Sequence, residues 1–222
     1  MEAPTTMISA AWDRVIAKYA GNVPVPFIRA LIHGESGGNA QKQNPTSHAT
    51  GLLQITEIVR RDWNTTHPGA PVMLGDLFDP EINVRIGAAL LNRIVQVYAH
   101  HPTLQPDWLS RRFAELVVLG WNAGYSDRGG VGLVVSELEA GGAAPDGVTV
   151  DTVARAAADL PQGSRFVARA DRVAWAKAVA DLYLGSRRNP VVASAGDMVG
   201  PVVIAALGTL GLAHFGRRGR TT

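Results

Sequence analysis

The chain has 222 residues, enough for one sizeable domain and an appended segment, and 46% of them are hydrophobic against 18% charged. Its formal net charge of +2 is too small to indicate a nucleic-acid partner. The absence of cysteine excludes disulfides, thiolate metal sites and a cysteine nucleophile.

Helical spacing of apolar residues begins near the start of the chain. A first amphipathic helix is predicted from Ile8 to Tyr19. A second covers residues 27–36, behind Pro26, because proline suits the first turn of a helix, and Gly37 should end it.

The second helix carries an acidic side chain at its end. Ile28, Leu31 and Ile32 precede Glu35 at offsets that place all four on one helical face. The apolar three should face the core, so Glu35 emerges where core meets cleft. Partial desolvation there raises the pKa of a carboxyl group, which suits a general acid near neutral pH. The alternative is a solvated glutamate in a last helical turn.

The middle of the chain alternates loops and helices. Residues 37–50 and 60–77 are polar or rich in proline and glycine, so both are expected to be loops. Asp79 before Pro80 is a good helix start, and the helical face continues to about His100.

Further helices are predicted over residues 106–120, between the glycine pairs at 129–130 and 141–142, and over 150–160 and 163–184. No segment alternates with a period of two over the length of a strand. The fold class is therefore mainly α, with at most a small hairpin in the polar loops.

The carboxyl-terminal segment has a different composition. Residues 191–215 are almost wholly apolar or small and are long enough to span a bilayer. We expect a domain over residues 1–186, then a basic-flanked segment over 187–222 with one transmembrane helix at about 191–215. A buried core helix or an apolar tail is the alternative, because Asp197 and Pro201 interrupt the first half.

Short motifs between residues 10 and 183 form an ordered set. They are Glu35-Ser36, Ser47–Gln54 (Ser-His-Ala-Thr-Gly-Leu-Leu-Gln), a helix from Asp79-Pro80 with Asn83, Gly87 and Leu91, Trp121–Gly124 (Trp-Asn-Ala-Gly), and a weaker Leu160-Pro161 before Arg165-Phe166-Val167. In this order they resemble the motifs of lysozyme-like lytic transglycosylases, the catalytic domain of soluble lytic transglycosylases. Goose-type lysozymes are more distant relatives.

The resemblance implies a lysozyme-like fold and cleavage of the MurNAc–GlcNAc β-1,4 bond of peptidoglycan, with formation of 1,6-anhydromuramic acid. Glu35 would be the only catalytic residue, acting first as acid and then as base on the muramyl 6-hydroxyl. No metal and no cofactor is needed. Four other acids are expected to be solvated or capping groups: Asp62, Asp76, Asp79 and Glu81.

The same resemblance implies a set of substrate-binding residues: Ser36, Ser47, Leu53, Gln54, Trp121, Asn122 and Phe166. Gln54 and Asn122 would hydrogen-bond the sugar or its N-acetyl group, and Leu53 would pack against the sugar where the family has methionine. Ser36 would orient Glu35 or serve as a helix-end cap.

Two of these positions depart from the family pattern. Trp121 and Phe166 stand where the family has tyrosines. The tyrosine hydroxyl at the first position is thought to steady the glutamate or the sugar. Trp121 offers only an N–H donor, although its ring can stack on a sugar.

Together these patterns and the resemblance predict an enzyme that binds peptidoglycan glycan strands and a membrane, but no nucleic acid. Residues 1–6 lack the pattern of a signal peptide. A phage virion that delivers the enzyme to the cell wall during entry, next to other virion proteins, would explain this. A tail-anchored protein of the bacterial cell envelope and an endolysin are alternatives. Two further alternatives concern activity: a goose-type lysozyme-like hydrolase, and a non-catalytic virion or membrane structural protein.

Overall fold

The computed structural model describes residues 10–141, 147–161 and 166–188, and these residues are mainly helical, as the sequence predicts. The elements are α1 (Asp13–Tyr19), α2 (Val25–Ser36), α3 (Glu57–Thr66), η1 (Gly75–Phe78), α4 (Pro80–Ala99), α5 (Arg111–Ala123), α6 (Gly130–Glu139), α7 (Val150–Ala158), η2 (Phe166–Ala168) and α9 (Ala170–Arg188). Within the described ranges, the strand-like pairings are isolated bridges of Thr50 with Gln43 and with Ile55.

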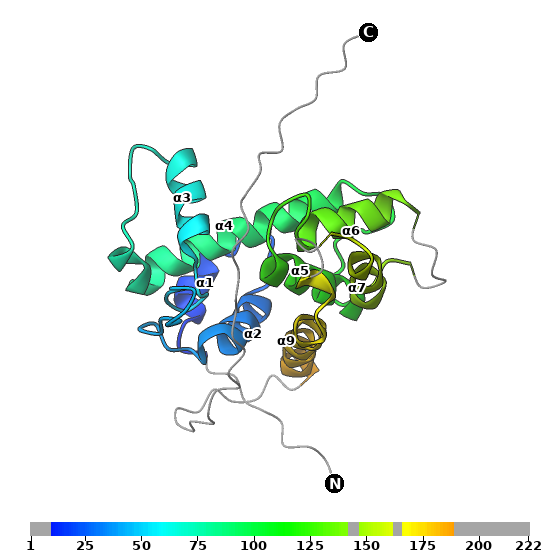
Figure 1. Ribbon diagram of the computed structural model, residues 1–222. Helices are drawn as coiled ribbons and strands as arrows, with labels where there is room; N and C mark the ends of the chain where they lie inside the picture. The colour runs from blue at the N-terminus through cyan, green and yellow to red at the C-terminus, as the bar shows by residue number, and fades with distance from the viewer. Residues whose placement is uncertain (1–9, 142–146, 162–165, 189–222) are drawn as a thin grey trace.

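The long helix α4 runs across the molecule, with α3 standing at one side of it and α5 to α7 at the other (Figure 1). Helix α2 packs against α1 and α9, and α9 also packs against α5. The apolar face predicted for α2 is confirmed, since Ile28, Leu31 and Ile32 are buried. The helix ends at Gly37, whose φ of 65° suits glycine.

The start of α4 is also as predicted. The side chain of Asp79 accepts hydrogen bonds from the backbone N–H groups of Glu81 and Ile82, and Pro80 occupies the first turn. One turn later Asn83 is fully buried and serves as a clamp. Its Oδ1 accepts from the N–H of Leu53 at 2.8 Å.

The amide nitrogen of Asn83 completes the clamp. Nδ2 donates to the carbonyls of Thr50 and Leu77, each at 2.8 Å. One buried side chain therefore holds the loop before α3 and the end of η1 against α4. Gly51 is required beside it, because an added Cβ would lie 2.2 Å from Nδ2 of Asn83 and the residue has a φ of +80°.

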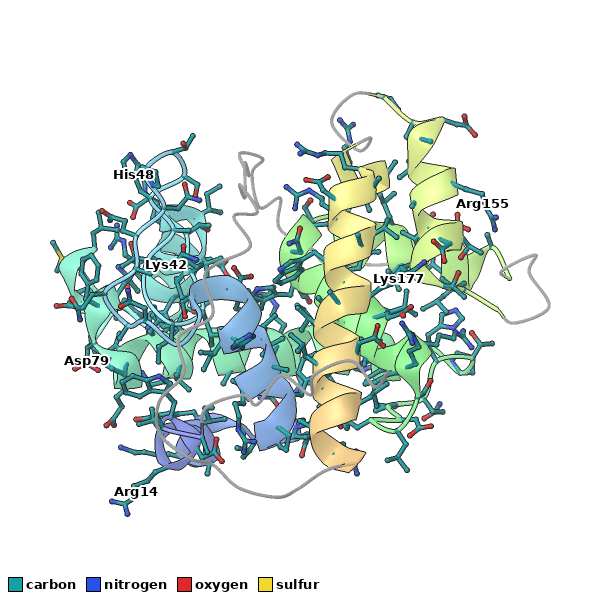
Figure 2. The ribbon with its side chains drawn as sticks, turned by 90° about the horizontal axis from the view of Figure 1, so that it is seen from below. Arg14, Lys42, His48, Asp79, Arg155 and Lys177 are labelled. Carbon is teal, nitrogen blue, oxygen red and sulfur yellow. The ribbon has the colours of Figure 1, made fainter. Side chains whose placement is uncertain are left out.

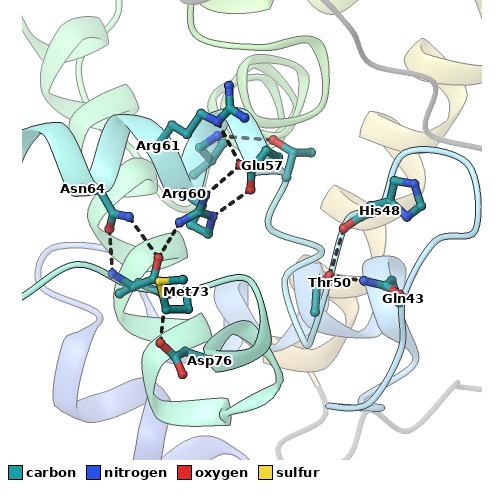
Figure 3. Close-up of polar contacts among 12 residues, drawn as sticks. Gln43, His48, Thr50, Glu57, Arg60, Arg61, Asn64, Met73 and Asp76 are labelled. Carbon is teal, nitrogen blue, oxygen red and sulfur yellow. Dashed lines mark hydrogen bonds and ion pairs between the residues drawn. The ribbon is translucent and has the colours of Figure 1, made fainter.

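The predicted loop over residues 60–77 is wrong in its first part, because α3 extends to Thr66. No residue of α3 is fully buried, and its apolar stripe is short, because Val59 and Trp63 pack against the core only in part. Polar contacts add to this packing. Thr56 caps its N-terminus, and Glu57 pairs with Arg60 and Arg61 (Figure 3). The hydrogen bond from Arg60 is the main cause that lowers the pKa of Glu57 to about 2.

The remaining loop after α3 is tied back to the helix. Asn64 accepts from the N–H of Val72 at 2.8 Å and donates to its carbonyl at 2.9 Å, and Arg60 donates to the same carbonyl (Figure 3). These bonds satisfy backbone groups that the proline- and glycine-rich segment leaves unpaired.

Two later helices begin after their predicted starts. Helix α5 begins at Arg111 rather than at residue 106, because Ser110 caps it by accepting from the N–H of Phe113. Helix α9 begins at Ala170 rather than residue 163, and η2 precedes it. The helices predicted around residues 130–141 and 150–160 are present as α6 and α7.

Within residues 10–141, 147–161 and 166–188, no helix has both the length and the apolar character needed to cross a membrane. The predicted transmembrane helix at about 191–215 lies outside these residues.

Replacing Asn83 with alanine should lower the free energy of unfolding by roughly 3 kcal/mol, because three buried backbone groups lose their partner. Urea unfolding followed by circular dichroism measures this. The matched control is Asn39→Ala, which removes an exposed side chain with one local hydrogen bond. Equal stability of the two variants would contradict the clamp.

Candidate active site

The predicted acid lies where two helix ends meet. Glu35 is in the last turn of α2 and Trp121 is near the end of α5, and Nε1 of Trp121 donates a 2.8 Å hydrogen bond to Oε1 of Glu35. Because an indole nitrogen can only donate, this bond favours the carboxylate form of Glu35.

The surroundings of Glu35 still favour its protonated form. Burial is the main effect, and it raises the pKa of Glu35 to about 7 against the opposing hydrogen bond from Trp121 and the charges of Lys42 and Arg172. The residue keeps partial exposure, as an acid that meets a substrate must. At neutral pH both of its protonation states are therefore populated, as an acid–base catalyst requires.

A loop folds back onto the end of α2 and brings Gln54 into the neighbourhood. Nζ of Lys42 donates to the backbone carbonyl of Glu35 at 2.7 Å, where a cation complements a helix C-terminus. Nε2 of Gln54 donates to the carbonyls of Lys42 and Gly51, at 3.2 and 2.9 Å. Since both hydrogens of the amide are engaged, Oε1 is the atom of Gln54 that remains to accept from another group.

Gln54 also has an uncommon backbone conformation. Its φ of 46° is in the left-handed region, which is sparsely populated by residues other than glycine. The turn is held by Gln54 N–H donating to the carbonyl of Gly51 and by paired bonds between Thr50 and Ile55. Such strain recurs at functional sites, where the surrounding structure maintains it.

Asn122, the neighbour of Trp121, is held by a residue that the sequence analysis did not select. Nη1 of Arg172 donates to the backbone carbonyl of Asn122 at 2.7 Å and to its Oδ1. Arg172 lies in the first turn of α9 and is only 5% exposed. The sequence offers no signal that singles out Arg172, because Arg165 and Arg169 stand in the same stretch.

Two serines of the predicted set make local contacts. Ser36 is buried, and its Oγ donates to the carbonyl of Ile32 and accepts from the N–H of Gly38. These bonds match the helix-end alternative of the sequence analysis. Oγ of Ser47 accepts from the N–H of Ala49 at 3.4 Å, within the loop before Gln54.

The expected sugar contact of Leu53 requires correction. Leu53 is fully buried and offers no surface to a substrate. It packs below the site beside Gly87, where an added Cβ would lie 2.4 Å from Cδ1 of Leu53 and 3.3 Å from Cη2 of Trp121. Leu53 and Trp121 therefore both approach α4 at Gly87. Phe166 begins η2, but its side chain lies outside what the structure describes.

Residues 15–129 match the family model described as the transglycosylase SLT domain, and this match spans more than half of the chain. The chain belongs to the transglycosylase SLT family. Its SLT domain includes Glu35, the Gln54 loop, Asn83 and the Trp121-Asn122 pair. No curated protein matches the sequence.

Solved structures share the fold of the SLT domain. The crystal structure of the 70 kDa soluble lytic transglycosylase from Escherichia coli aligns with a TM-score of 0.56 at 20% identity, over 82% of this chain and 25% of that one. A 70-kDa soluble lytic transglycosylase in complex with bulgecin A aligns with the same TM-score and identity, over 80% of this chain and 24% of that one. The present chain thus spans about a quarter of the length of these proteins.

The four acids that were expected to be solvated or capping groups all have partners within the fold, and Asp79 is a cap as expected. Asp62 pairs with Arg93, Asp76 accepts from the N–H of Met73, Asp79 caps α4, and Glu81 pairs with Lys18 and Tyr19. Among the described residues, the charged side chains that shift the pKa of Glu35 are both cations. No group of three or more potential metal-ligating side chains occurs in these ranges.

Replacing Trp121 with phenylalanine should raise the pKa of Glu35 above its value of about 7, because the ring remains but the N–H that favours the carboxylate is lost. A carbon-13 NMR titration of the Glu35 carboxyl measures this directly. Trp108→Phe is the control, since its indole donates to the carbonyl of Asn22 instead. An unchanged titration in Trp121→Phe would contradict this assignment.

Proposed function

We propose that the chain is a peptidoglycan lytic transglycosylase that cleaves the MurNAc–GlcNAc β-1,4 bond and leaves 1,6-anhydromuramic acid. One observation carries this proposal: a single acid with a pKa of about 7 lies at the meeting point of α2 and α5, and the charges acting on it are cationic. Hydrolysis of glycosides normally requires two carboxylates, one acting as acid and one as base or nucleophile. A transglycosylase requires one.

The reaction uses Glu35 twice. Protonated Glu35 gives its proton to the glycosidic oxygen as the bond from C1 of the muramyl sugar to that oxygen breaks. The resulting carboxylate then takes the proton of the muramyl 6-hydroxyl while O6 bonds to C1. No water is consumed, and Glu35 returns to its protonated form. A pKa near 7 serves both proton transfers about equally.

Neighbouring groups support each form of the acid. The hydrogen bond from Trp121 and the charges of Lys42 and Arg172 stabilise the carboxylate that forms after the first proton transfer. Trp121 thereby supplies the donor that the family tyrosine would supply. We assign sugar binding to Gln54 and Asn122, whose amides are fixed by the backbone carbonyls of Lys42 and Gly51 and by Arg172 respectively.

Glu35→Gln should abolish the release of anhydromuropeptides from purified sacculi, a loss of at least a hundredfold, because glutamine cannot transfer a proton. Mass spectrometry of the soluble products measures the outcome. Glu139→Gln, at the exposed end of α6, is the matched control and should retain full activity.

The products also separate the proposal from its alternatives. Fragments with reducing ends, 18 mass units heavier than the anhydro form, would identify a goose-type hydrolase that uses water. No fragments from the native chain would favour a non-catalytic virion or membrane structural protein.

We further propose that the segment at about 191–215 anchors the enzyme in a membrane and that the enzyme assists a phage in crossing the cell wall as part of the virion. The apolar composition of this segment and its flanking arginines support the anchor. The bacterial cell envelope is the alternative location that the same chemistry permits.

Anchoring predicts that the full chain co-sediments with vesicles of phosphatidylcholine and phosphatidylglycerol and resists extraction by alkaline carbonate. A chain ending at Arg188, which keeps α9 whole, should stay in the supernatant while retaining activity on sacculi. Equal sedimentation of the two chains would contradict the anchor.

A further inference from the structure

Helix α9 brings a buried cation to the site from outside the matched family segment. Gly34, one residue before Glu35, permits its close approach, because an added Cβ would lie 3.0 Å from Cγ2 of Val179 and 3.5 Å from the ring of Trp175. Arg172 lies on the same face, one turn before Trp175. Figure 2 shows α2 and α9 side by side, with Lys42 beyond the end of α2.

The contacts of Arg172 determine how the Asn122 amide is turned. A guanidinium group only donates hydrogen bonds, so the atom of the Asn122 side chain that faces Nη1 of Arg172 must be the oxygen. The second bond, to the backbone carbonyl of Asn122, prevents Arg172 from following a rotation of that side chain. Since the two ends of a planar amide point apart, Nδ2 is directed away from Arg172.

The direction of Nδ2 is significant because Asn122 is only half-buried and adjoins Trp121, which contacts the acid. A donor here complements the carbonyl oxygen of a 2-acetamido group. A sugar that has lost its acetyl group instead presents an ammonium, which only donates and is repelled by the nearby guanidinium.

We propose that Arg172 is a positioning residue that fixes the Asn122 amide with Nδ2 directed away from the guanidinium, where it can donate to a bound sugar, and that this makes the site selective for N-acetylated over de-N-acetylated glycan. This inference rests on the proposed function for the identity of the glycan. Arg172 itself contacts no substrate.

Removing Arg172 has a second effect that the test must separate. The groups that act on Glu35 are Trp121 from α5, Lys42 from the loop after α2 and Arg172 from α9, so loss of Arg172 raises the pKa of Glu35 as well. Binding measured at pH 5 avoids this effect, because Glu35 is then protonated in every variant.

The experiment compares binding of chitotetraose and of the glucosamine tetramer by titration calorimetry. The native chain should prefer chitotetraose. Arg172→Met, which keeps the length of the side chain but has no donor, should raise the dissociation constant for chitotetraose about tenfold and leave that for the glucosamine tetramer unchanged. Arg155→Met, on the exposed face of α7, is the control and should change neither.

Asn122→Asp tests the same idea without disturbing Arg172. The aspartate still accepts from Nη1 of Arg172, but it replaces the outward donor with an acceptor. We expect its preference to reverse in favour of the glucosamine tetramer. Asn122→Ala combined with Arg172→Met should bind chitotetraose as weakly as either single variant, because both act through one hydrogen bond.

Several outcomes would overturn the inference: a native chain without preference, a loss in Arg172→Met that is equal for both oligomers, or an unchanged preference in Asn122→Asp. The proposed lytic activity is tested separately. Anhydromuropeptides released by a native chain without acetyl preference would leave that activity standing and remove the role of Arg172. If the chain shows the expected binding pattern but releases no such products, the role of Arg172 stands and the proposed lytic activity is removed.

Discussion

The hydrogen bond between Trp121 and Glu35 constrains the rest of the molecule, because it requires α2 and α5 to bring Nε1 of Trp121 within 2.8 Å of Oε1 of Glu35. Contacts with other elements hold both helices in this position. The close approach of α9 at Gly34 holds α2 from one side, and the packing of Leu53 and Trp121 at Gly87 sets the level of the site above α4. An extra methyl group at either glycine would meet a neighbour at 3.0 Å or less, so these contacts leave little freedom for the acid.

This arrangement works against the stability of the fold. The pKa of Glu35 is about 7 in the folded chain against an ordinary value of 4.5. The folded state therefore binds the proton more tightly than the unfolded state. The contribution of this proton to the free energy of unfolding is complete below pH 4.5 and is lost as the pH rises through 7. Above pH 7 the folded chain is about 3 kcal/mol less stable than it would be with an ordinary pKa at Glu35. Lys42, Arg172 and Trp121 limit the loss, since each favours the carboxylate that burial disfavours.

The sequence predicted what depends on local patterns. The apolar face of α2, its glycine stop and the Asp79-Pro80 start of α4 follow from periodicity and capping alone. Helix α3 was missed because its inward apolar residues, Val59 and Trp63, are only partly buried and ion pairs and a threonine cap add to their packing. The position of Glu35 at a helix end was predictable. The approach of α9 to this end was not, because the packing of α9 against α2 joins residues far apart in the chain.

The site residues show the same distinction between local patterns and long-range contacts. Gln54, Trp121 and Asn122 were found through their motifs, whereas their polarity depends on partners that no motif names. The backbone carbonyls of Lys42 and Gly51 engage the amide hydrogens of Gln54, and Arg172 engages the amide oxygen of Asn122. The first amide can then only accept from a ligand, and the second has its two amide hydrogens left to donate. An acetamido group carries one donor and one acceptor, so these internal contacts give the motif residues a chemical preference that their identities alone do not determine.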